Sequence, residues 1–350
     1  MKFSNLFTPE RTTLFPLIVI FIIASFLNVV SQEIAGGGSF VRDISGGAAL
    51  IFRAPKNPVV QDIGAVQVSG GRTTGHRTTQ PVRKQDQMLA KGNAARSAPK
   101  PRYAEAEQQY QMAAEVAPDD ARAFAGLGNI YVDQGRFAEA VDAYRKAIAV
   151  RPEYTPAYMP LAFSLARLDR FPEAIEVYQL TLKSDSSNPE IYNNLAFAYN
   201  HSQRYQDAID SAKQAIRLLG DTGEAYTQGL QDRKEVLSYA YKNLGNGYAG
   251  LKRYGEAADA LKQAAKIAPT NASAQFNLGL SLYNAGRYAE AIDAYKEVIK
   301  LRPTLGQAHF NLGIVYYAIN DKASAMAEVT ALKDIDGELA NQLLAIVQQH

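Results

Sequence analysis

The pattern of apolar and polar residues between positions 121 and 152 predicts two amphipathic helices joined by a short turn. Apolar residues recur there at intervals of three and four, the spacing that places side chains on one face of an α-helix. They are Leu127, Ile130 and Tyr131 in the first helix and Phe137, Ala140, Tyr144 and Ala147 in the second. Gly135 supplies the turn, and Pro152 ends the second helix. One such hairpin cannot bury its apolar face alone, so neighbouring hairpins are needed to cover it.

The same pattern returns along the chain with a period of 34 residues. An alanine of the second helix marks each unit, and its positions are Ala106, Ala140, Ala174, Ala208, Ala257, Ala291 and Ala325. Only the step from Ala208 to Ala257 departs from the period, because it is 49 residues long. Small residues such as Gly128 and Ala140 let the two helices approach closely, and a larger side chain there would cost about 1–3 kcal/mol.

These positions resemble the tetratricopeptide repeat family, whose units are helix–turn–helix hairpins of about 34 residues. The resemblance covers roughly residues 102–339, where the period, the small residues, the aromatic residues and the terminal prolines all agree. The tryptophan of the family's first helix is replaced by Phe124, Tyr158, Tyr192, Tyr241, Gln275 and His309. The resemblance implies an all-α fold: a right-handed superhelical solenoid with a concave side, preceded by a disordered or weakly structured N-terminal region.

The repeat positions divide the chain into segments. We expect a degenerate N-terminal repeat at 85–120, three repeats at 121–222, an insertion at 223–237, three repeats at 238–339 and a capping helix at 335–350. The insertion is interpreted as a surface loop or as an N-terminal extension of the next helix, since insertions in solenoids usually map to loops. The alternative is a hinge between the two sets of repeats.

The first 31 residues have the features of a targeting segment. An apolar run from Leu14 to Val30 follows Lys2 and Arg11, and small residues precede Gln32. We expect a cleaved signal peptide or a retained N-terminal membrane anchor, with a buried core helix as the remaining alternative. Either of the first two outcomes places the repeats outside the cytoplasm, secreted, periplasmic or anchored to the membrane.

Residues 32–84 are rich in Gly, Thr and Arg, and they predict a basic linker with a possible short hairpin. The formal net charge of +2 hides a split, since residues 35–102 hold 11 Lys and Arg against 3 Asp and Glu. The repeats are therefore acidic overall. A basic segment could bind an anionic lipid or glycan of the cell envelope, but no aromatic interleaving supports a nucleic-acid partner.

The sequence offers no candidate chemistry. It has no cysteine, which excludes disulfides, thiol catalysis and thiolate metal sites. The four histidines, His76, His201, His309 and His350, have no metal-ligand spacing, and His309 falls on a repeat packing position. No nucleophile motif is present. We therefore expect no catalytic residues, no cofactor and no metal.

The family resemblance implies a partner-binding groove on the first helices. The residues two before, two after and five after the repeat leucine form a stripe that lines the concave side in this family. The candidate groove residues, one of them from the position before the leucine, are Met159, Phe163, Phe197, Lys242, Asn246, Phe276, Asn277, Leu280, Tyr283, Phe310, Ile314 and Tyr317. In the last two repeats this stripe holds six large apolar or aromatic residues, which either form a patch for a partner or are covered by neighbouring helices.

A second resemblance concerns the carboxylate clamp with which some family members hold acidic C-terminal tails. Lys242, Asn246 and Asn277 match three of its positions, but Gln307 and Asn311 stand where Lys and Arg are expected. The residues therefore favour a non-catalytic scaffold that binds an extended or helical segment of a protein partner in the groove. The alternatives are an envelope-binding module that uses residues 35–102 and an accessory subunit of an enzyme complex.

Overall fold

The computed structural model describes residues 83–221 and 230–348. These residues form fifteen α-helices and one short 3-10 helix, and no strand occurs among them. The all-α prediction is confirmed. The predicted signal peptide or anchor, and all but the last two residues of the predicted linker with its hairpin, lie outside the described residues. Within the described ranges, no helix is both long and apolar enough to cross a membrane.

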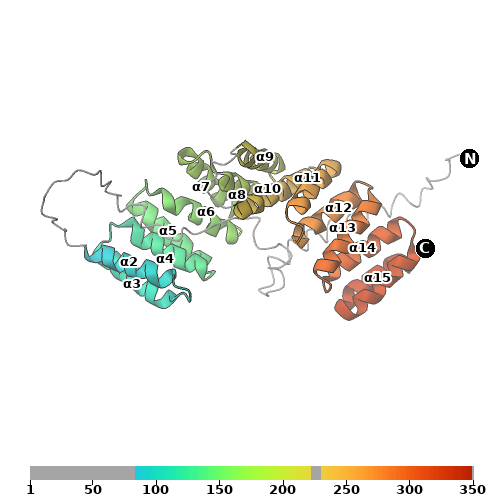
Figure 1. The fold of residues 1–350 in the computed structure, drawn as a ribbon, viewed down its shortest axis with the longest axis horizontal. Helices are drawn as coiled ribbons and strands as arrows, with labels where there is room; N and C mark the ends of the chain where they lie inside the picture. Colours follow the sequence, from blue (N-terminus) through green and yellow to red (C-terminus); the bar gives the residue numbers. More distant parts are fainter. Residues whose placement is uncertain (1–82, 222–229, 349–350) are drawn as a thin grey trace, which may run out of the picture. The chain divides into compact units, whose positions relative to one another are not determined.

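The helices follow one another as seven hairpins, which we number repeats 1 to 7, with a helix A and a helix B in each (Figure 1). The first four pairs are α2 (Lys84–Arg96) with α3 (Tyr103–Val116), α4 (Ala121–Asp133) with α5 (Phe137–Val150), η2 (Thr155–Ala157) and α6 (Tyr158–Arg167) with α7 (Phe171–Ser184), and α8 (Pro189–His201) with α9 (Tyr205–Asp221). The last three are α10 (Leu230–Gly250) with α11 (Tyr254–Ile267), α12 (Ala272–Asn284) with α13 (Tyr288–Leu301), and α14 (Gly306–Ala318) with α15 (Lys322–Ile335). The final helix is α16 (Gly337–Gln348). Every helix B packs against its own helix A and the next one, which is the connectivity of a solenoid.

The marker alanines lie at the contacts between helices. All seven are fully buried, so the period visible in the sequence is the period of helix packing. Opposite the glycine of helix A stands a tyrosine of helix B in repeats 1, 2 and 6, and a leucine of helix B in repeat 5. A Cβ atom on Gly128 would lie 2.6 Å from the Tyr144 ring, and one on Gly279 would lie 2.9 Å from the Tyr295 ring. Glycine is therefore required at these positions by space.

The buried tyrosines also make hydrogen bonds across the hairpin. The Tyr110 hydroxyl donates to Asn93 Oδ1 at 2.6 Å, and the Tyr144 hydroxyl donates to Asn129 Oδ1 at 2.8 Å. Burial raises the pKa of Tyr110 to about 12, so the hydroxyl stays protonated and remains a donor. These bonds satisfy the polar end of a side chain that otherwise fills the core.

The turn from helix A to helix B has one backbone feature in common. Its second residue takes a left-handed conformation, with φ of 73° at Gly135 and 75° at Gly286. Non-glycine residues take the same conformation at this place in other repeats, and they are Asp169, Gln203, Lys252 and Asn320. Gly135 therefore supplies the turn as the sequence predicts, although glycine is not the only residue used there.

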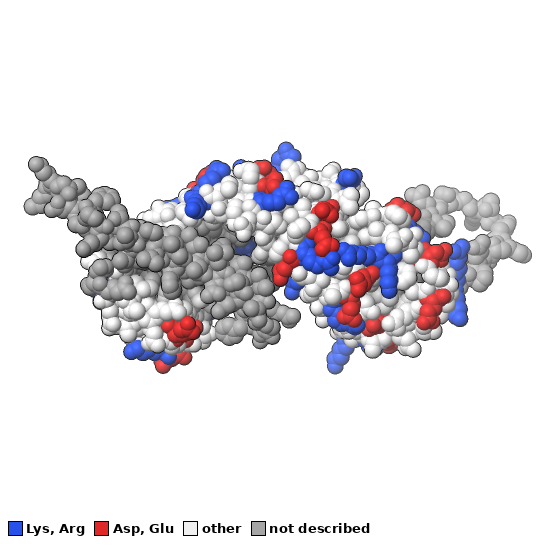
Figure 2. All heavy atoms as spheres, turned by 180° about the vertical axis from the view of Figure 1, so that it is seen from behind, with Lys and Arg blue, Asp and Glu red and all other residues white. Residues whose placement is uncertain are grey.

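Ion pairs run along the helix B surfaces from one repeat to the next. Arg145 pairs with Glu173 at 2.7 Å, and Arg287 pairs with Asp259 at 3.2 Å. On the face shown in Figure 2, cations and carboxylates are accordingly interspersed over the coloured surface. Such exposed pairs contribute at most about 1 kcal/mol each, so the solenoid depends mainly on its apolar contacts.

The first hairpin is joined firmly to the second, as expected of a degenerate but real repeat. Arg96 Nε lies 2.6 Å from Asp133, and Arg122 lies 2.8 Å from Asp86, so α2 and α4 are linked at both ends. The turn between α2 and α3 spans residues 97–102 and contains the two prolines that lengthen it.

The long step in the period falls on α9 and α10. Residues 222–229 lie outside the described residues, and α10 begins at Leu230, so the second half of the predicted insertion extends helix A of repeat 5. The α10 helix packs against α8, α9 and α11, and it thereby links repeats 4 and 5. At the far end, α16 packs on α14 and α15 through Ala340, Leu343 and Val347.

We predict that the helix contact is sensitive to one methyl group. Gly128→Ala is expected to lower the free energy of unfolding by about 1–3 kcal/mol, because its Cβ would enter the space of the Tyr144 ring. The matched control is Gly255→Ala in α11, where no atom lies within 4 Å of the added Cβ. That variant is expected to gain up to about 1 kcal/mol from helix propensity. Urea unfolding would contradict the packing argument if both variants changed stability equally.

A second prediction concerns the start of α4. Burial raises the pKa of Asp120, but hydrogen bonds from Arg122 outweigh burial and hold it below its usual value. A lowered folded pKa gives stability that is present above the unfolded pKa of about 3.9 and is lost as pH falls through the folded pKa. Urea unfolding between pH 7 and pH 3 should therefore show less acid loss in Asp120→Asn than in wild type. The exposed neighbour variant Asp119→Asn should retain the wild-type profile, and identical profiles for Asp120→Asn and wild type would refute the assignment.

Candidate partner-binding groove

The candidate groove residues lie on helix A of repeats 3 to 7, and none of the twelve is exposed. Buried members are Phe163, Lys242, Phe276, Phe310 and Ile314. Half-buried members are Met159, Phe197, Asn246, Asn277, Leu280, Tyr283 and Tyr317. Neighbouring side chains therefore cover most of each residue in the stripe, and only the edges of the half-buried ones are accessible to a partner.

Repeats 1 and 2 use their equivalent positions for internal bonds. The polar residues on this face of α2 and α4 all have partners within the two repeats, and they are Asp86, Asn93, Arg96, Arg122, Asn129 and Asp133. Their hydrogen-bonding groups are already engaged, so this part of the face serves stability. The groove available to a partner therefore begins at repeat 3.

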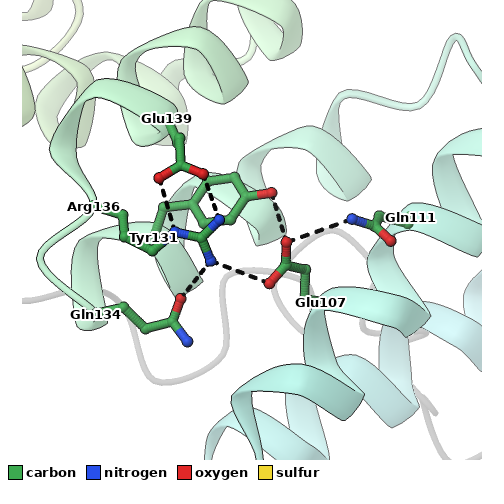
Figure 3. Close-up of polar contacts among 6 residues, drawn as sticks. All are labelled: Glu107, Gln111, Tyr131, Gln134, Arg136 and Glu139. Carbon is green, nitrogen blue, oxygen red and sulfur yellow. Dashed lines mark hydrogen bonds and ion pairs between the residues drawn. The ribbon is translucent and has the colours of Figure 1, made fainter.

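A polar cluster joins repeats 1 and 2 at the helix A–helix B turn (Figure 3). The Arg136 guanidinium lies 4.3 Å from the centre of the Tyr131 ring and donates to Glu107 at 3.3 Å and to Glu139 at 2.8 Å. The Tyr131 hydroxyl also donates to Glu107, at 3.0 Å. Burial and then this bond raise the pKa of Tyr131. The cluster spans α3, α4 and α5 and fixes the first repeat to the array.

Aromatic and cationic side chains meet where helix B of repeat 2 begins. The rings of Phe137 and Phe163 are 6.1 Å apart and stand nearly edge-to-face at 70°. The Arg167 guanidinium, on the exposed last residue of α6, lies 4.5 Å from the centre of the Phe137 ring. This distance is within the range of a cation–π contact.

The same arrangement returns one repeat later. Phe171 and Phe197 are again 6.1 Å apart, at 65°, and the His201 ring stacks on Phe171 at 4.8 Å and 20°. The surrounding rings, and after them the positive charge of Lys242, lower the pKa of His201 to about 4. The imidazole is therefore neutral at pH 7, although its residue as a whole is exposed.

Asparagines join helix A of repeat 4 to helix A of repeat 5. The buried Asn243 amide donates to the Asn193 carbonyl at 3.1 Å and to Asn193 Oδ1 at 2.9 Å. In return, the Asn200 amide donates to the Asn243 carbonyl at 2.9 Å. These reciprocal bonds link α8 and α10 on both sides of the predicted insertion.

The three residues that match the carboxylate clamp lie near one another on α10 and α12. The Asn277 amide donates to Asn246 Oδ1 at 2.9 Å, so the two clamp amides bind each other. The Lys242 side chain is buried, with its amine 5.4 Å from the centre of the Tyr239 ring. The clamp thus stays a hypothesis on residues that already have internal contacts.

In repeat 6 two aromatic groove residues pack against other aromatic side chains. Phe276 lies 5.7 Å from Tyr295, and Tyr283 lies 5.7 Å from Tyr288. Phe310 and Ile314 are 2% and 3% exposed, which leaves Leu280, Tyr283 and Tyr317 as the accessible part of the six-residue set. Whether this set receives a partner remains a prediction.

The histidines that the structure describes have packing roles. His309 Nδ1 lies 2.7 Å from Glu328, and Nε2 lies 3.0 Å from the Pro303 carbonyl, so the ring links α14 to α15 and to the preceding turn. Within residues 83–221 and 230–348, no group of three or more His, Asp or Glu side chains is arranged to hold a metal ion.

These features define an all-helical protein built from repeated helical hairpins. Models of the tetratricopeptide repeat match residues 121–154, 160–221, 242–306 and 282–346, which together make up more than half of the chain. The chain therefore belongs to the tetratricopeptide repeat family. Members of this family generally act as non-catalytic scaffolds and bind protein or peptide partners. The comparison with curated proteins gave no match.

Solved structures show the same fold. A tetratricopeptide repeat protein from Parabacteroides merdae is similar over 76% of this chain and 99% of its own, with 15% identity and a TM-score of 0.52. PilF of Pseudomonas aeruginosa is similar over 64% and 96%, with 20% identity and a TM-score of 0.51. YrrB, described as having an unusual peptide-binding site, covers 59% and 99%, with 23% identity and a TM-score of 0.46.

The sequence did not single out the aromatic and cationic residues at the edge of the groove. Arg167 and His201 each follow a groove phenylalanine by four residues, one helical turn. Their ring partners begin helix B of the preceding repeat, outside the stripe that the family resemblance marks. A search for arginine or histidine four residues after an aromatic groove position could have found them.

We predict that the asparagine bridge stabilises the junction of repeats 4 and 5. Asn243→Leu is expected to lower the free energy of unfolding by about 1–3 kcal/mol, because the buried carbonyl and side-chain oxygens of Asn193 lose this donor. The control is Asn284→Leu, whose half-buried amide bonds only to Leu280 of its own helix. Urea unfolding should show the larger loss in Asn243→Leu, and equal losses would contradict a bridging role.

Proposed function

We propose that the chain is an extracytoplasmic scaffold that binds a segment of a partner protein in the groove of repeats 3 to 7. The observation that carries this proposal is the change of chemistry along the groove stripe. At the position after the small residue, repeats 1 and 2 have Asn93 and Asn129, which bind core tyrosines. Repeats 3 and 4 have Phe163 and Phe197 there instead, and these rings contact other aromatic side chains.

The aromatic residues favour binding because the repeat fold does not need them at this position. The asparagine in repeats 1 and 2 completes a hydrogen bond inside the hairpin, whereas Phe197 is half-buried and keeps part of its ring accessible. Half-buried apolar side chains continue along the stripe at Leu280 and Tyr317. Accessible apolar edges in consecutive repeats suit an extended or helical peptide that crosses several helices.

The extracytoplasmic location is supported by the N-terminal sequence. The apolar run from Leu14 to Val30 has the length and flanks of a targeting segment. The basic balance of residues 35–102 offers a second contact, with an anionic component of the envelope. A role as an accessory subunit of an enzyme complex would use the same groove.

Site-specific photo-crosslinking in the native host tests this function. A photoreactive residue replaces Phe197, Leu280 or Tyr317, which are half-buried and can therefore reach a partner. We expect one recurrent protein to be captured at these positions. The matched control is the exposed Lys146 on α5, where no such capture is expected.

Three other outcomes would overturn the proposal. Capture at the exposed Lys91 and not in the groove would assign binding to the basic segment. Detection of the chain in a cytoplasmic fraction, with no capture from an extracytoplasmic compartment, would contradict the proposed extracytoplasmic location. Turnover by the purified chain would replace the scaffold with an enzyme.

A further inference from the structure

Two consecutive repeat junctions carry the same three-residue unit at the edge of the groove. Each unit combines the first residue of one helix B with a phenylalanine and a nitrogen-bearing side chain, four residues apart, on the next helix A. We call them the first rung, Phe137, Phe163 and Arg167, and the second rung, Phe171, Phe197 and His201. The two phenylalanine pairs agree in separation, 6.1 Å in both, and in angle, 70° and 65°.

The rungs are not a requirement of the repeat fold. The positions of the second and third rung members hold other residues in the neighbouring repeats, namely Asn129 and Asp133 in repeat 2, Asn246 and Gly250 in repeat 5, Leu280 and Asn284 in repeat 6, and Ile314 and Ala318 in repeat 7. Those repeats form the same hairpins with the same buried marker alanines. The rungs are therefore a local feature of repeats 2 to 4.

The chemistry of a rung suits a carboxylate. A guanidinium carries its N–H donors in a planar fork that matches the two oxygens of a carboxylate. Arg167 is exposed, and its contact with the Phe137 ring already restricts its motion. Its side chain therefore loses less conformational entropy when a partner binds. His201 is held in the same way on Phe171 and carries one N–H when neutral.

The charges around the rungs point to the same ligand. On the groove stripe of repeats 3 to 5 there is no carboxylate, and the one charged residue is Lys242. Asp169 lies in the turn after α6, close to Arg167. Burial raises the pKa of Asp169, and the positive charge of Arg167 opposes this rise. Apart from this turn residue, an incoming acid meets Arg167 and then the His201 ring on two consecutive repeats, and the positive charge of the buried Lys242 lies on the third.

We propose that the two rungs bind two carboxylates of one extended partner segment, carried by acidic residues three positions apart. The proposal rests on the proposed function, since it names the chemistry of the segment in the groove. The spacing follows from geometry. Packed helices lie about 8–10 Å apart, and an extended chain in the polyproline II conformation advances about 3.1 Å per residue with three residues per turn. Residues i and i+3 of such a chain therefore lie on one face and span one repeat.

Selection of peptides on the full chain tests the proposal. The probe is a display library of random dodecapeptides, and the selected sequences are then synthesised and titrated by fluorescence anisotropy. We expect enrichment of Asp or Glu pairs at positions i and i+3. Exchange of either acid for its amide should weaken binding about tenfold, the factor expected for one charge-assisted hydrogen bond.

Variants of the rungs supply the second measurement. Arg167→Met keeps the apolar contact with Phe137 but removes the donors, and His201→Phe keeps the stack on Phe171. Each variant should lose about tenfold in affinity for the selected peptides. Peptides in which the acid is replaced by its amide should bind the variant and the wild type equally well. Lys146→Ala, an exposed cation on α5, is the matched control and should bind as wild type does. Thermal unfolding of each variant checks that the array is intact.

The outcomes separate this proposal from the proposed function. The carboxylate-binding role of the rungs is wrong if the selected peptides lack acid pairs. It is also wrong if they bind Arg167→Met as tightly as wild type. Either result would leave a groove that binds apolar segments. Failure to select any peptide also overturns the rungs. The proposed function itself fails only if photo-crosslinking at Phe197, Leu280 and Tyr317 captures no partner in the host.

Discussion

The hairpins of repeats 1, 2, 5 and 6 depend on one close contact, in which a bulky residue of helix B lies over a glycine of helix A. The contact of Tyr144 with Gly128 leaves no room for a side chain, because a single added carbon would lie 2.6 Å from the ring. Such a contact cannot shift by one residue without a clash or a cavity, so it sets the register of each hairpin. The fully buried marker alanines bring the next hairpin equally close. The 34-residue period is the sequence record of this constraint.

Once that contact is fixed, the residues on the other face of helix A are free to vary. Repeats 1 and 2 use them for ion pairs and for the hydrogen bonds of Tyr110 and Tyr144, which close the N-terminal part of the face. Repeats 3 and 4 use them for aromatic contacts instead, and repeats 4 and 5 place an asparagine bridge there at Asn243. The repeats share a core and differ in surface, which is how one fold can carry a local binding site.

The fold could be predicted from sequence because its determinants are periodic and local. The marker alanines, the Gly135 turn and the helix spacing all appeared in the pattern and were found in the structure. The site could be predicted only in part. Membership of the stripe follows from the period, but burial depends on neighbours from other repeats, so Phe310 and Tyr317 differ in exposure although both lie on it. The stacking of His201 on Phe171 joins two helices, and the period gives the positions of the two residues but not the contact between their rings.

Burial of the groove residues also constrains how a partner can bind. A deep apolar cleft would expose whole rings, whereas here the stripe shows the edges of side chains such as Phe197 and Leu280. Edges provide little apolar area per repeat, so an apolar segment alone would gain only modest affinity from each one. Specificity must then come from polar groups that are already oriented, because oriented groups lose less entropy on binding. The Arg167 and His201 side chains, which contact the Phe137 and Phe171 rings, are such groups, and they follow the ion-paired part of the face.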